Sequence, residues 1–552
     1  MPVHAARYYY LDNFRRVLAW LRQRYDDLLT QDERGFVDVF SGIPVESSAL
    51  LVRMVTRRGT LFRNSKLVYE EIGCARHAAA PLIAAGFVDP APSLAWPEVQ
   101  RLLTKAELAA AFEIAPEWRR ARKPQLVEHL QASGDAMSAV TAWLRRVDET
   151  IYQLAVAPLC ERFRLLFFGN FRQDWSEFVL TDLGIFRYER VALDAAARAF
   201  HTRAEIDQFA ALYRCRELLH AECAPEQVLA NIPPPLAGCA WIEARRARLL
   251  FQVGQRFEKA RHFPQALGVY LTCGEPDATA RASRVLEKLE RWSEARDLLQ
   301  TIDASCASEA LLHDAERMRP RLCRKLGPDE SLSIRRARVR HAWSTFEVEI
   351  PPSPEPVPVE RLAAEHLSSP QAPVMFVENA LLNSLLGLSC WEAIFAPLPG
   401  AFFHEFQAAP ADLLAPDFYS RRAHEFAACF ARFESGEYRD CVLRTYAEKS
   451  GTATPFVAWD SLTPELLTLA LECIPPEHLL SCFARILSDI RANRAGLPDL
   501  IQFFPRERRY RLIEVKGPGD RLQNNQVRWL GFCVDRQIDV AVCKVKWRAA
   551  LA

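Results

Sequence analysis

The chain has 552 residues, half of them hydrophobic and a quarter charged, so we expect a folded protein with several domains rather than a single core. Its 70 Lys and Arg residues nearly balance its 69 Asp and Glu residues, which leaves a net charge of +1. A polyanion would therefore have to bind local basic patches rather than bulk positive charge. The start of the chain lacks a signal-peptide pattern, and no apolar run approaches the roughly 20 residues that span a bilayer. The lack of such a run predicts no membrane partner. The 15 cysteines are scattered without zinc-ligand spacing, which favours a cytoplasmic protein with free thiols.

The first 350 residues are mainly helical in pattern. In "FRRVLAWLRQRYDDLL", Phe14, Val17, Leu18 and Leu21 recur at helical spacing. A basic stretch and a short helix closed by Gly86 follow, and together they resemble a small winged-helix or helix-turn-helix unit. We therefore predict a helical, winged-helix-like DNA-binding region over residues 1–95.

Residues 102–130 read as two short helices joined by the basic linker "RRARK". Thr104 followed by Glu107 is a capping-box pattern that predicts the start of a helix. This arrangement resembles the SAP-type module that binds duplex DNA. We predict the SAP-like module and its helical continuation over residues 96–230.

An internal repeat lies between residues 231 and 348. "FEKARHFPQAL" at 257 recurs as "LEKLERWSEAR" at 286, so that Phe263 matches Trp292 and Ala266 matches Ala295. Small and aromatic residues that recur at a fixed step predict stacked helical hairpins of tetratricopeptide type. Prolines then concentrate in 349–360, which predicts a stiff linker before the C-terminal domain.

Residues 361–552 open with helices and end in strands, and the order helix, hairpin, helix, strand is that of an α/β endonuclease core. The hairpin "PDLIQFFPRERRYRLIEVK" can bring Asp499 beside Glu514, with Lys516 on the same face as Glu514. Two converging carboxylates favour a hard divalent ion, Mg²⁺ or Mn²⁺. Lys516 would then orient or help deprotonate a water, which suits hydrolysis of a phosphodiester. Taken alone, however, Glu-x-Lys on a strand is more often a solvated face.

Further motifs strengthen the functional interpretation. "NRAGLPDLIQF", "IEVKGPGDRLQNNQVRWL" and the final strand resemble the virus-type replication-repair nuclease domain of the PD-(D/E)xK superfamily. "FVENALLNSLLG", "YAEKSGTATPFVAW" and the basic stretch at 51–72 resemble the Fanconi-associated nucleases. The resemblance implies a structure-specific DNA nuclease that cuts near 5′ flaps, degrades DNA from 5′ ends and acts in interstrand crosslink repair.

The same resemblance assigns roles to individual residues. It implies catalytic roles for Asp499, Glu514, Lys516 and Gln526, and a metal site made by Glu378, Asp499, Glu514 and the carbonyl of Val515. The ubiquitin-binding zinc finger of eukaryotic members has no counterpart here. We therefore expect a bacterial member associated with nucleoid DNA, whose partner is branched or flapped double-stranded DNA.

Basic residues concentrate in runs that could hold phosphates. The first run is interleaved with Leu61 and Phe62 and comprises Arg53, Arg57, Arg58, Arg63 and Lys66. The second run lies in the SAP-like segment and comprises Arg119, Arg120, Arg122 and Lys123. Both runs are predicted to bind DNA. A third run comprises Arg335, Arg336, Arg338 and Arg340. The alternative for any such run is a solvated face.

Two other functions remain open from the sequence. A Holliday-junction or restriction-type nuclease uses the same motif but is usually a compact dimer without a 350-residue helical forepart. A non-catalytic DNA-binding scaffold with a decayed nuclease domain is the second alternative, although decay would normally remove one of the three central residues, Asp499, Glu514 or Lys516.

Overall fold

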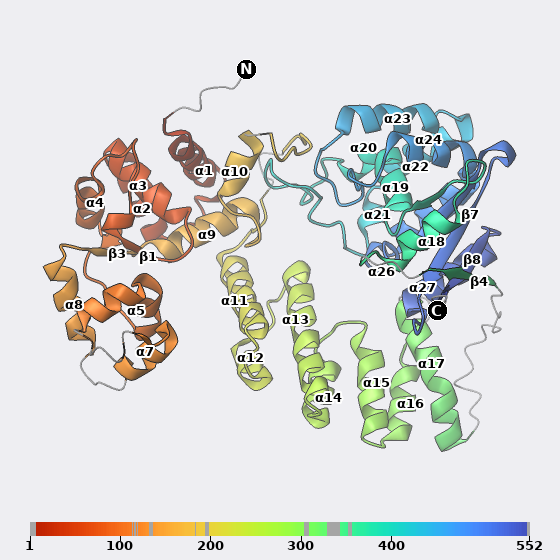
Figure 1. The fold of residues 1–552 in the computed structure, drawn as a ribbon, viewed down its shortest axis with the longest axis horizontal. Coiled ribbons are helices and arrows are strands. Elements are labelled where there is room, and N and C mark those ends of the chain that lie inside the picture. The colour runs from red at the N-terminus through yellow and green to blue at the C-terminus, as the bar shows by residue number, and fades with distance from the viewer. Residues whose placement is uncertain are drawn as a thin grey trace. The chain divides into compact units, whose positions relative to one another are not determined.

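The computed structural model describes residues 7–112, 114, 118, 120–131, 136–182, 184–193, 198–302, 309–327, 343–351 and 356–548. It is mainly helical and contains two separate sheets (Figure 1). The chain forms two compact units, one made of Met1–Phe186 with Arg198–Ile206 and the other of Arg187–Ala197 with Asp207–Ala552.

The first unit begins with a helical group whose apolar stripe is the one that the sequence predicts. Phe14, Val17, Leu18 and Leu21 are all buried on α1. Outside the SAP-like segment, the helices of residues 1–186 are α1 (Tyr9–Tyr25), α2 (Gln31–Gly42), α3 (Val45–Val55), α4 (Ala75–Ala84), α9 (Ala157–Phe168) and α10 (Ser176–Asp182). Helix α4 is followed by Gly86 in the left-handed conformation, with φ at +70°, so the predicted helix stop is present.

A three-stranded antiparallel sheet accompanies these helices, in the order β1 (Leu61–Arg63), β3 (Ile151–Leu154), β2 (Val88–Asp89). Strand β3 lies between the other two although it follows the SAP-like segment in sequence. The winged-helix-like region therefore extends beyond the predicted boundary at residue 95, because a strand from residues 151–154 completes its sheet.

The SAP-like segment forms a small helical cluster with its own core. Its helices are α5 (Trp96–Leu102), α6 (Lys105–Ala111), α7 (Lys123–Gln131) and α8 (Ala136–Arg146). Val99, Leu108 and Leu126 are completely buried in it. The predicted capping box is present, since the Thr104 hydroxyl accepts from the Glu107 amide at 3.3 Å and the Glu107 carboxylate accepts from the Thr104 amide at 2.7 Å.

The predicted repeat corresponds to two helical hairpins of the second unit. The helices of this region are α11 (Arg203–His220), α12 (Pro225–Asn231), α13 (Ala240–Lys259), α14 (Phe263–Thr272), α15 (Ala278–Lys288), α16 (Trp292–Gln300) and α17 (Glu309–Leu326), and Figure 1 shows α13 to α17 side by side. The turns between α13 and α14 and between α15 and α16 each contain a left-handed residue, Arg261 at φ +62° and Glu290 at φ +60°. Ala266 and Ala295 are fully buried at equivalent places. The repeated letters therefore mark repeated turns and repeated close packing.

The C-terminal region contains a five-stranded sheet in the order β4 (Ser344–Ile350), β8 (Val540–Trp547), β7 (Arg509–Lys516), β6 (Leu500–Phe504), β5 (Val374–Phe376). The pairs β4–β8 and β8–β7 are parallel, and the pairs β7–β6 and β6–β5 are antiparallel. Strand β7 is thus central. The sheet begins before the predicted linker at 349–360 and includes its first two residues, because Glu349 and Ile350 belong to β4 and pair with β8.

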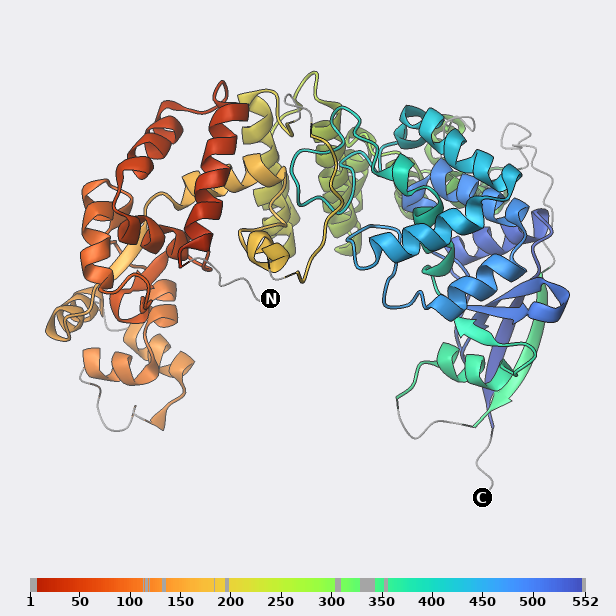
Figure 2. The same ribbon diagram turned by 90° about the horizontal axis from the view of Figure 1, so that it is seen from above.

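Helices cover both faces of this sheet, as Figure 2 shows from a second direction. On one face, Leu500, Ile513 and Val515 pack with α18 (Val359–Leu367). On the other, a larger core joins the sheet to α19 (Leu381–Ser389), α20 (Trp391–Ile394), α21 (Phe418–Arg421), α22 (Ala423–Ser435), α23 (Tyr438–Lys449), α24 (Pro464–Cys473), α25 (Pro476–Ser488), α26 (Ile490–Asn493) and α27 (Asn524–Asp535). Among the described residues, no single helix has the length and apolar character needed to cross a membrane.

Candidate active site

The β6–β7 hairpin brings the two central carboxylates together. Leu500 pairs with Ile513 in antiparallel register, so Asp499, one residue before β6, lies opposite Glu514. Residues directly opposite each other on antiparallel strands project to the same face. The short 3-10 turn at Pro505–Glu507 closes the hairpin where the sequence predicts a turn.

Both carboxylates are buried, with exposed fractions of 6% for Asp499 and 0% for Glu514. One Asp499 oxygen accepts a hydrogen bond from the Val515 amide at 2.8 Å. The Lys516 ammonium lies 2.8 Å from Oε1 of Glu514, and this side chain is itself mostly buried. Apart from this contact with the Lys516 ammonium, neither Glu514 oxygen accepts a hydrogen bond of normal geometry from any described residue. A buried carboxylate with open acceptor sites is the kind of group that a cation satisfies.

The pKa values of Asp499 and Glu514 also indicate a site that a cation would stabilise. Burial, followed by the negative charges of Glu360 and Glu378, raises the pKa of Asp499 to about 6, although Lys516 and the Val515 amide act to lower it. Burial and the charge of Asp499 raise the pKa of Glu514 to about 7. Two acids in one buried site cannot both ionise cheaply unless positive charge is added. The donor set contains oxygen atoms only, which fits a hard divalent ion such as Mg²⁺ or Mn²⁺.

Glu378 approaches this pair through its backbone. The amides of Val377 and Glu378 both donate to the Asp499 carbonyl, at 2.8 and 3.1 Å. The Glu378 side chain is exposed, and its Oε1 accepts from the Asn379 side chain at 3.3 Å. Within the described ranges, no three acidic, His or Cys side chains are gathered as a preformed metal site. The structure therefore brings Asp499, Glu514 and Lys516 together and holds the Glu378 backbone beside them without converging its carboxylate.

Val515 and Gln526 occupy different surroundings. Val515 is buried on β7, and its amide binds the Asp499 carboxylate. The Gln526 side-chain oxygen accepts from the Gln523 amide at 2.8 Å and so caps the start of α27. The structure therefore gives this amide a helix-capping partner, and its catalytic role stays a prediction.

Three residues near the site are not among those predicted from the sequence. Asn379 contacts Glu378, Glu360 on α18 acts electrostatically on Asp499, and Lys544 on β8 pairs in register with Lys516. Lys544 is exposed and lies on the same face as Lys516, since residues paired in a sheet share a face. Only the Asn379 position carried a signal, because it belongs to the "VEN" segment that resembles the nuclease family.

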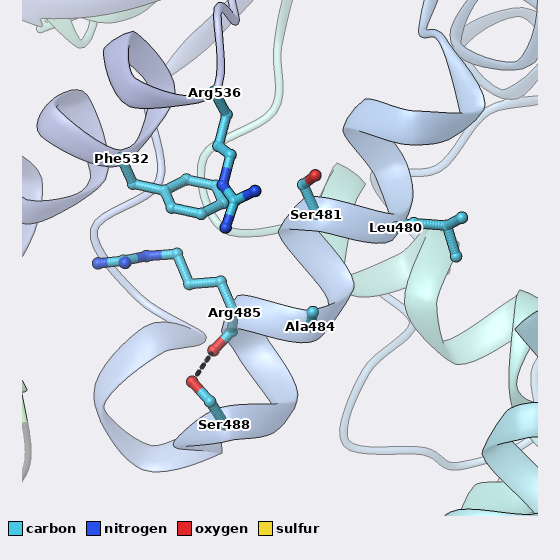
Figure 3. Close-up of a pocket in the computed structure, with 7 residues that line it drawn as sticks. All are labelled: Leu480, Ser481, Ala484, Arg485, Ser488, Phe532 and Arg536. Atoms are coloured by element: carbon cyan, nitrogen blue, oxygen red, sulfur yellow. Dashed lines mark hydrogen bonds between the residues drawn. The ribbon is translucent and has the colours of Figure 1, made fainter. Parts of the chain in front are cut away.

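A pocket of about 540 Å³ lies elsewhere on this unit, between α25 and α27 (Figure 3). Its walls include Arg485 and Arg536, whose guanidinium groups lie 4.7 and 5.8 Å from the Phe532 ring. None of the predicted catalytic or metal-binding residues lines this pocket. It is therefore separate from the candidate active site.

The first basic run divides into two groups. Arg53 donates to the Glu71 carboxylate and lies 3.9 Å from the Tyr10 ring centre. Arg63 forms ion pairs with Glu107 at 2.8 Å and Glu149 at 3.0 Å, with only 10% of its side chain exposed. These two guanidinium groups already have carboxylate partners within the fold, so we expect them to support the structure rather than hold phosphates.

The other members of the two runs are more accessible. Arg57, Arg58, Lys66, Arg120 and Arg122 are exposed. The Lys123 ammonium donates to the Leu103 carbonyl at 2.7 Å, which ties it to its own helical cluster. Arg119 and the third run, Arg335 to Arg340, lie outside the described residues. DNA contact by the accessible residues remains a prediction.

Known families match most of these regions. The sequence model described as "FAN1, HTH domain" matches residues 8–89, "Fanconi anemia-associated nuclease SAP domain" matches 94–143, and "VRR-NUC domain" matches 434–547. A Fanconi-associated nuclease 1 homolog of Pseudomonas aeruginosa is 47% identical over 551 residues, which cover 99% of this chain and 97% of that relative. The chain belongs to the Fanconi-associated nuclease 1 family.

Membership of the Fanconi-associated nucleases is also visible in three dimensions. The structure titled "Crystal structure of paFAN1 bound to 2nt 5'flap DNA with gap" matches with a TM-score of 0.92 and 47% identity, covering 100% of both chains. A homolog from Arabidopsis thaliana is 25% identical, covering 97% of this chain and 66% of its own length. The predicted fold class, a helical forepart with a SAP module followed by an α/β nuclease domain, is confirmed.

Proposed function

We propose that this chain is a structure-specific, divalent-metal-dependent DNA endonuclease and 5′ exonuclease that hydrolyses phosphodiester bonds in 5′-flapped and related branched DNA. The observation that supports this most directly is the buried pair Asp499 and Glu514 with Lys516 at 2.8 Å from Glu514. Membership of the Fanconi-associated nucleases supports the same activity. The 47% identity along nearly the whole chain argues against a compact resolvase or restriction-type nuclease. The intact central residues argue against a non-catalytic scaffold.

In this proposal, Asp499 and Glu514 would hold the metal ion, Glu378 would complete the site, and the Val515 carbonyl would add a neutral ligand. A hard divalent ion supplies charge neutralisation at the phosphate and lowers the pKa of water. Lys516 would orient the attacking water, and its charge favours the ionised form of Glu514 by acting to lower the pKa of that carboxyl. Because Asp499, just before β6, and Glu514, on the central strand β7, are both buried, the fold excludes bulk water and strengthens these electrostatic effects.

The substrate proposal rests on the relatives. Two structures of paFAN1 that resemble this chain contain 5′-flap DNA with a gap. We extend that substrate to this chain and, from the family, propose interstrand crosslinks as the lesion. A protein with this substrate works where DNA is, and we place it with the nucleoid of a bacterial cell.

Cleavage of a panel of labelled DNAs tests the proposed activity. The panel contains a 5′ flap, a 3′ flap, a nicked duplex, an intact duplex and a single strand of matched sequence, each assayed with Mg²⁺, Mn²⁺, Ca²⁺ or EDTA. We expect the 5′ flap to be cut fastest with Mg²⁺ or Mn²⁺, and no cleavage in EDTA. Cleavage of all five substrates at equal rates, or full activity in EDTA, would contradict the proposal.

Charge reversal at Arg57 and Arg58 tests the basic surface of the first unit. We expect the double change to Glu to weaken binding of flap DNA by about 10-fold or more. The affinity should also depend less on salt, because a protein that contacts fewer phosphates releases fewer counterions when it binds. Arg34→Glu on α2 of the same unit is a matched control, since its guanidinium donates to the Asp26 carbonyl outside the predicted run. Fluorescence anisotropy between about 50 and 300 mM salt measures both quantities. Equal slopes for wild type and the double variant would remove this surface from the proposal.

A further inference from the structure

We propose that Asn379 is a positioning residue that fixes Glu378 against the loop bearing Asp499, so that the Glu378 carboxylate can complete the metal site. This inference rests on the proposed nuclease function and deepens it. Asn379 lies between β5 and α19, directly after Glu378. Its side chain forms hydrogen bonds with both Glu378 and the segment leading to Asp499.

The backbone at Asn379 has a conformation that few residues adopt. Its φ is +52°, in the left-handed region, where Asn and Gly are tolerated and other side chains are strained. This conformation turns the chain from strand to helix immediately after Glu378. The cost of the turn must be repaid by surrounding contacts, and such conformations cluster at functional sites.

The side chain supplies two of these contacts. Its Oδ1 accepts from the Leu497 amide at 3.1 Å, two residues before Asp499. Its Nδ2 donates to Oε1 of Glu378 at 3.3 Å. One amide group therefore links the Glu378 carboxylate to the loop that bears Asp499.

The main chain reinforces this link from two sides. The Asp499 carbonyl accepts from the Val377 and Glu378 amides. The Asn379 carbonyl accepts from Nδ2 of Asn383 at 2.6 Å, and the same nitrogen donates to the Arg494 carbonyl at 2.9 Å. Asn383 is 5% exposed, so these bonds are shielded from competing water.

Different contacts position the Asp499–Glu514 pair and the Glu378 side chain. The Asp499–Glu514 pair is set by the ladder between β6 and β7, which does not involve Asn379. The Glu378 side chain is exposed and accepts a hydrogen bond from the Asn379 amide, so we expect its orientation to depend on Asn379. Loss of the Asn379 amide should therefore weaken metal binding through Glu378 and leave the hairpin unchanged.

Mn²⁺ affinity without DNA, measured by isothermal titration calorimetry, tests the proposal independently of catalysis. Asn379→Gly keeps the left-handed backbone and removes the amide, and we expect the Mn²⁺ Kd to rise about 10-fold or more, as for other groups that orient metal ligands. In a Glu378→Ala background the same change should raise Kd no further, because the residue it positions is absent. Asn231→Ala is the control, since that side-chain amide donates to the Gln227 carbonyl of its own helix.

A second variant guards against simple misfolding. Asn379→Asp retains an oxygen for the Leu497 amide and tolerates positive φ, but places a negative charge against Glu378. We expect weaker Mn²⁺ binding with an unchanged melting temperature, and partial recovery of cleavage at high Mn²⁺. Wild-type Kd in both variants, or an equal loss in the Glu378→Ala background, would overturn the positioning role alone. Failure of the wild-type protein to bind Mn²⁺ or to cut DNA would instead overturn the proposed function.

Discussion

Asp499→Asn and Lys516→Ala are each expected to lower the single-turnover rate of 5′-flap cleavage by about 10³-fold or more, a loss typical of removing a group from metal-assisted or acid–base chemistry. Asp499→Asn keeps the shape of the side chain but removes one of the two charges that would hold the ion. Lys516→Ala removes the ammonium that lies 2.8 Å from Glu514. Both changes act at the reacting centre, so affinity for flap DNA should change far less than the cleavage rate.

Lys546→Ala provides a matched control for the lysine. Lys546 lies on β8 of the same sheet, is exposed, and forms an ion pair with Glu347 of β4 at 2.6 Å, so its ammonium already has a carboxylate partner other than Asp499 and Glu514. This variant should cut flap DNA at the wild-type rate. Cleavage by Asp499→Asn at more than a tenth of the wild-type rate, with metal dependence intact, would show that the chemistry occurs elsewhere.

The second large effect concerns stability. The metal-free protein is expected to lose stability as the pH rises from about 5 to about 8, and Mn²⁺ is expected to restore it. Burial and the charges of Glu360 and Glu378 raise the pKa of Asp499 to about 6, and burial and the charge of Asp499 raise the pKa of Glu514 to about 7. Unfolded carboxyl groups titrate near pH 4. Between these limits the folded state binds more protons than the unfolded state, so the free energy of unfolding falls with increasing pH.

The size of this effect follows from the displacement of each pKa. A displacement of about two pH units corresponds to roughly 3 kcal/mol for one carboxyl, a large fraction of the stability of a typical domain. A divalent ion competes with the same protons. Mn²⁺ should therefore stabilise the protein more at pH 8 than at pH 5.5, because it binds the ionised pair and adds to stability by mass action.

Thermal unfolding of metal-free wild type and Asp499→Asn across this pH range measures the linkage. The difference between the two melting curves isolates the pair from the other titrating groups. Asp499→Asn should be the more stable protein at pH 8 without metal, and it should gain little from Mn²⁺. The buried carboxylate of Asp499 would thus lower the stability of the metal-free protein while supporting its activity. Parallel pH profiles for the two proteins would contradict the assignment of the raised pKa values.

These two experiments address features that were predictable from short stretches of sequence. The register of Asp499 and Glu514 follows from a hairpin with a tight turn, and a strand places alternate residues on one face. The turns at Arg261 and Glu290 repeat because the local helix–turn–helix sequence repeats. The capping box at Thr104 involves residues only three apart. Each of these structures is determined by neighbours along the chain.

Other features depend on a partner that lies far away along the chain. Arg63 belongs to a basic run but meets Glu107 and Glu149, which come from other segments. Gln526 matches a nuclease motif and its oxygen caps a helix, so its catalytic role stays a prediction. Charge and spacing in sequence cannot show which cations already have carboxylate partners, because those partners arrive only when the chain folds.

The sequence by itself determined the class of the chain, the pairing of Asp499 with Glu514 and the presence of Lys516 beside them, because hairpin geometry is local and the motif sits within one hairpin. Only the tertiary structure decided that strands from residues 151–154 and 344–350 complete the two sheets. It alone placed Asn379 against both Glu378 and Leu497. Such long-range contacts are selected by burial and by the hydrogen-bonding demands of the whole fold, and no short stretch of sequence contains both partners.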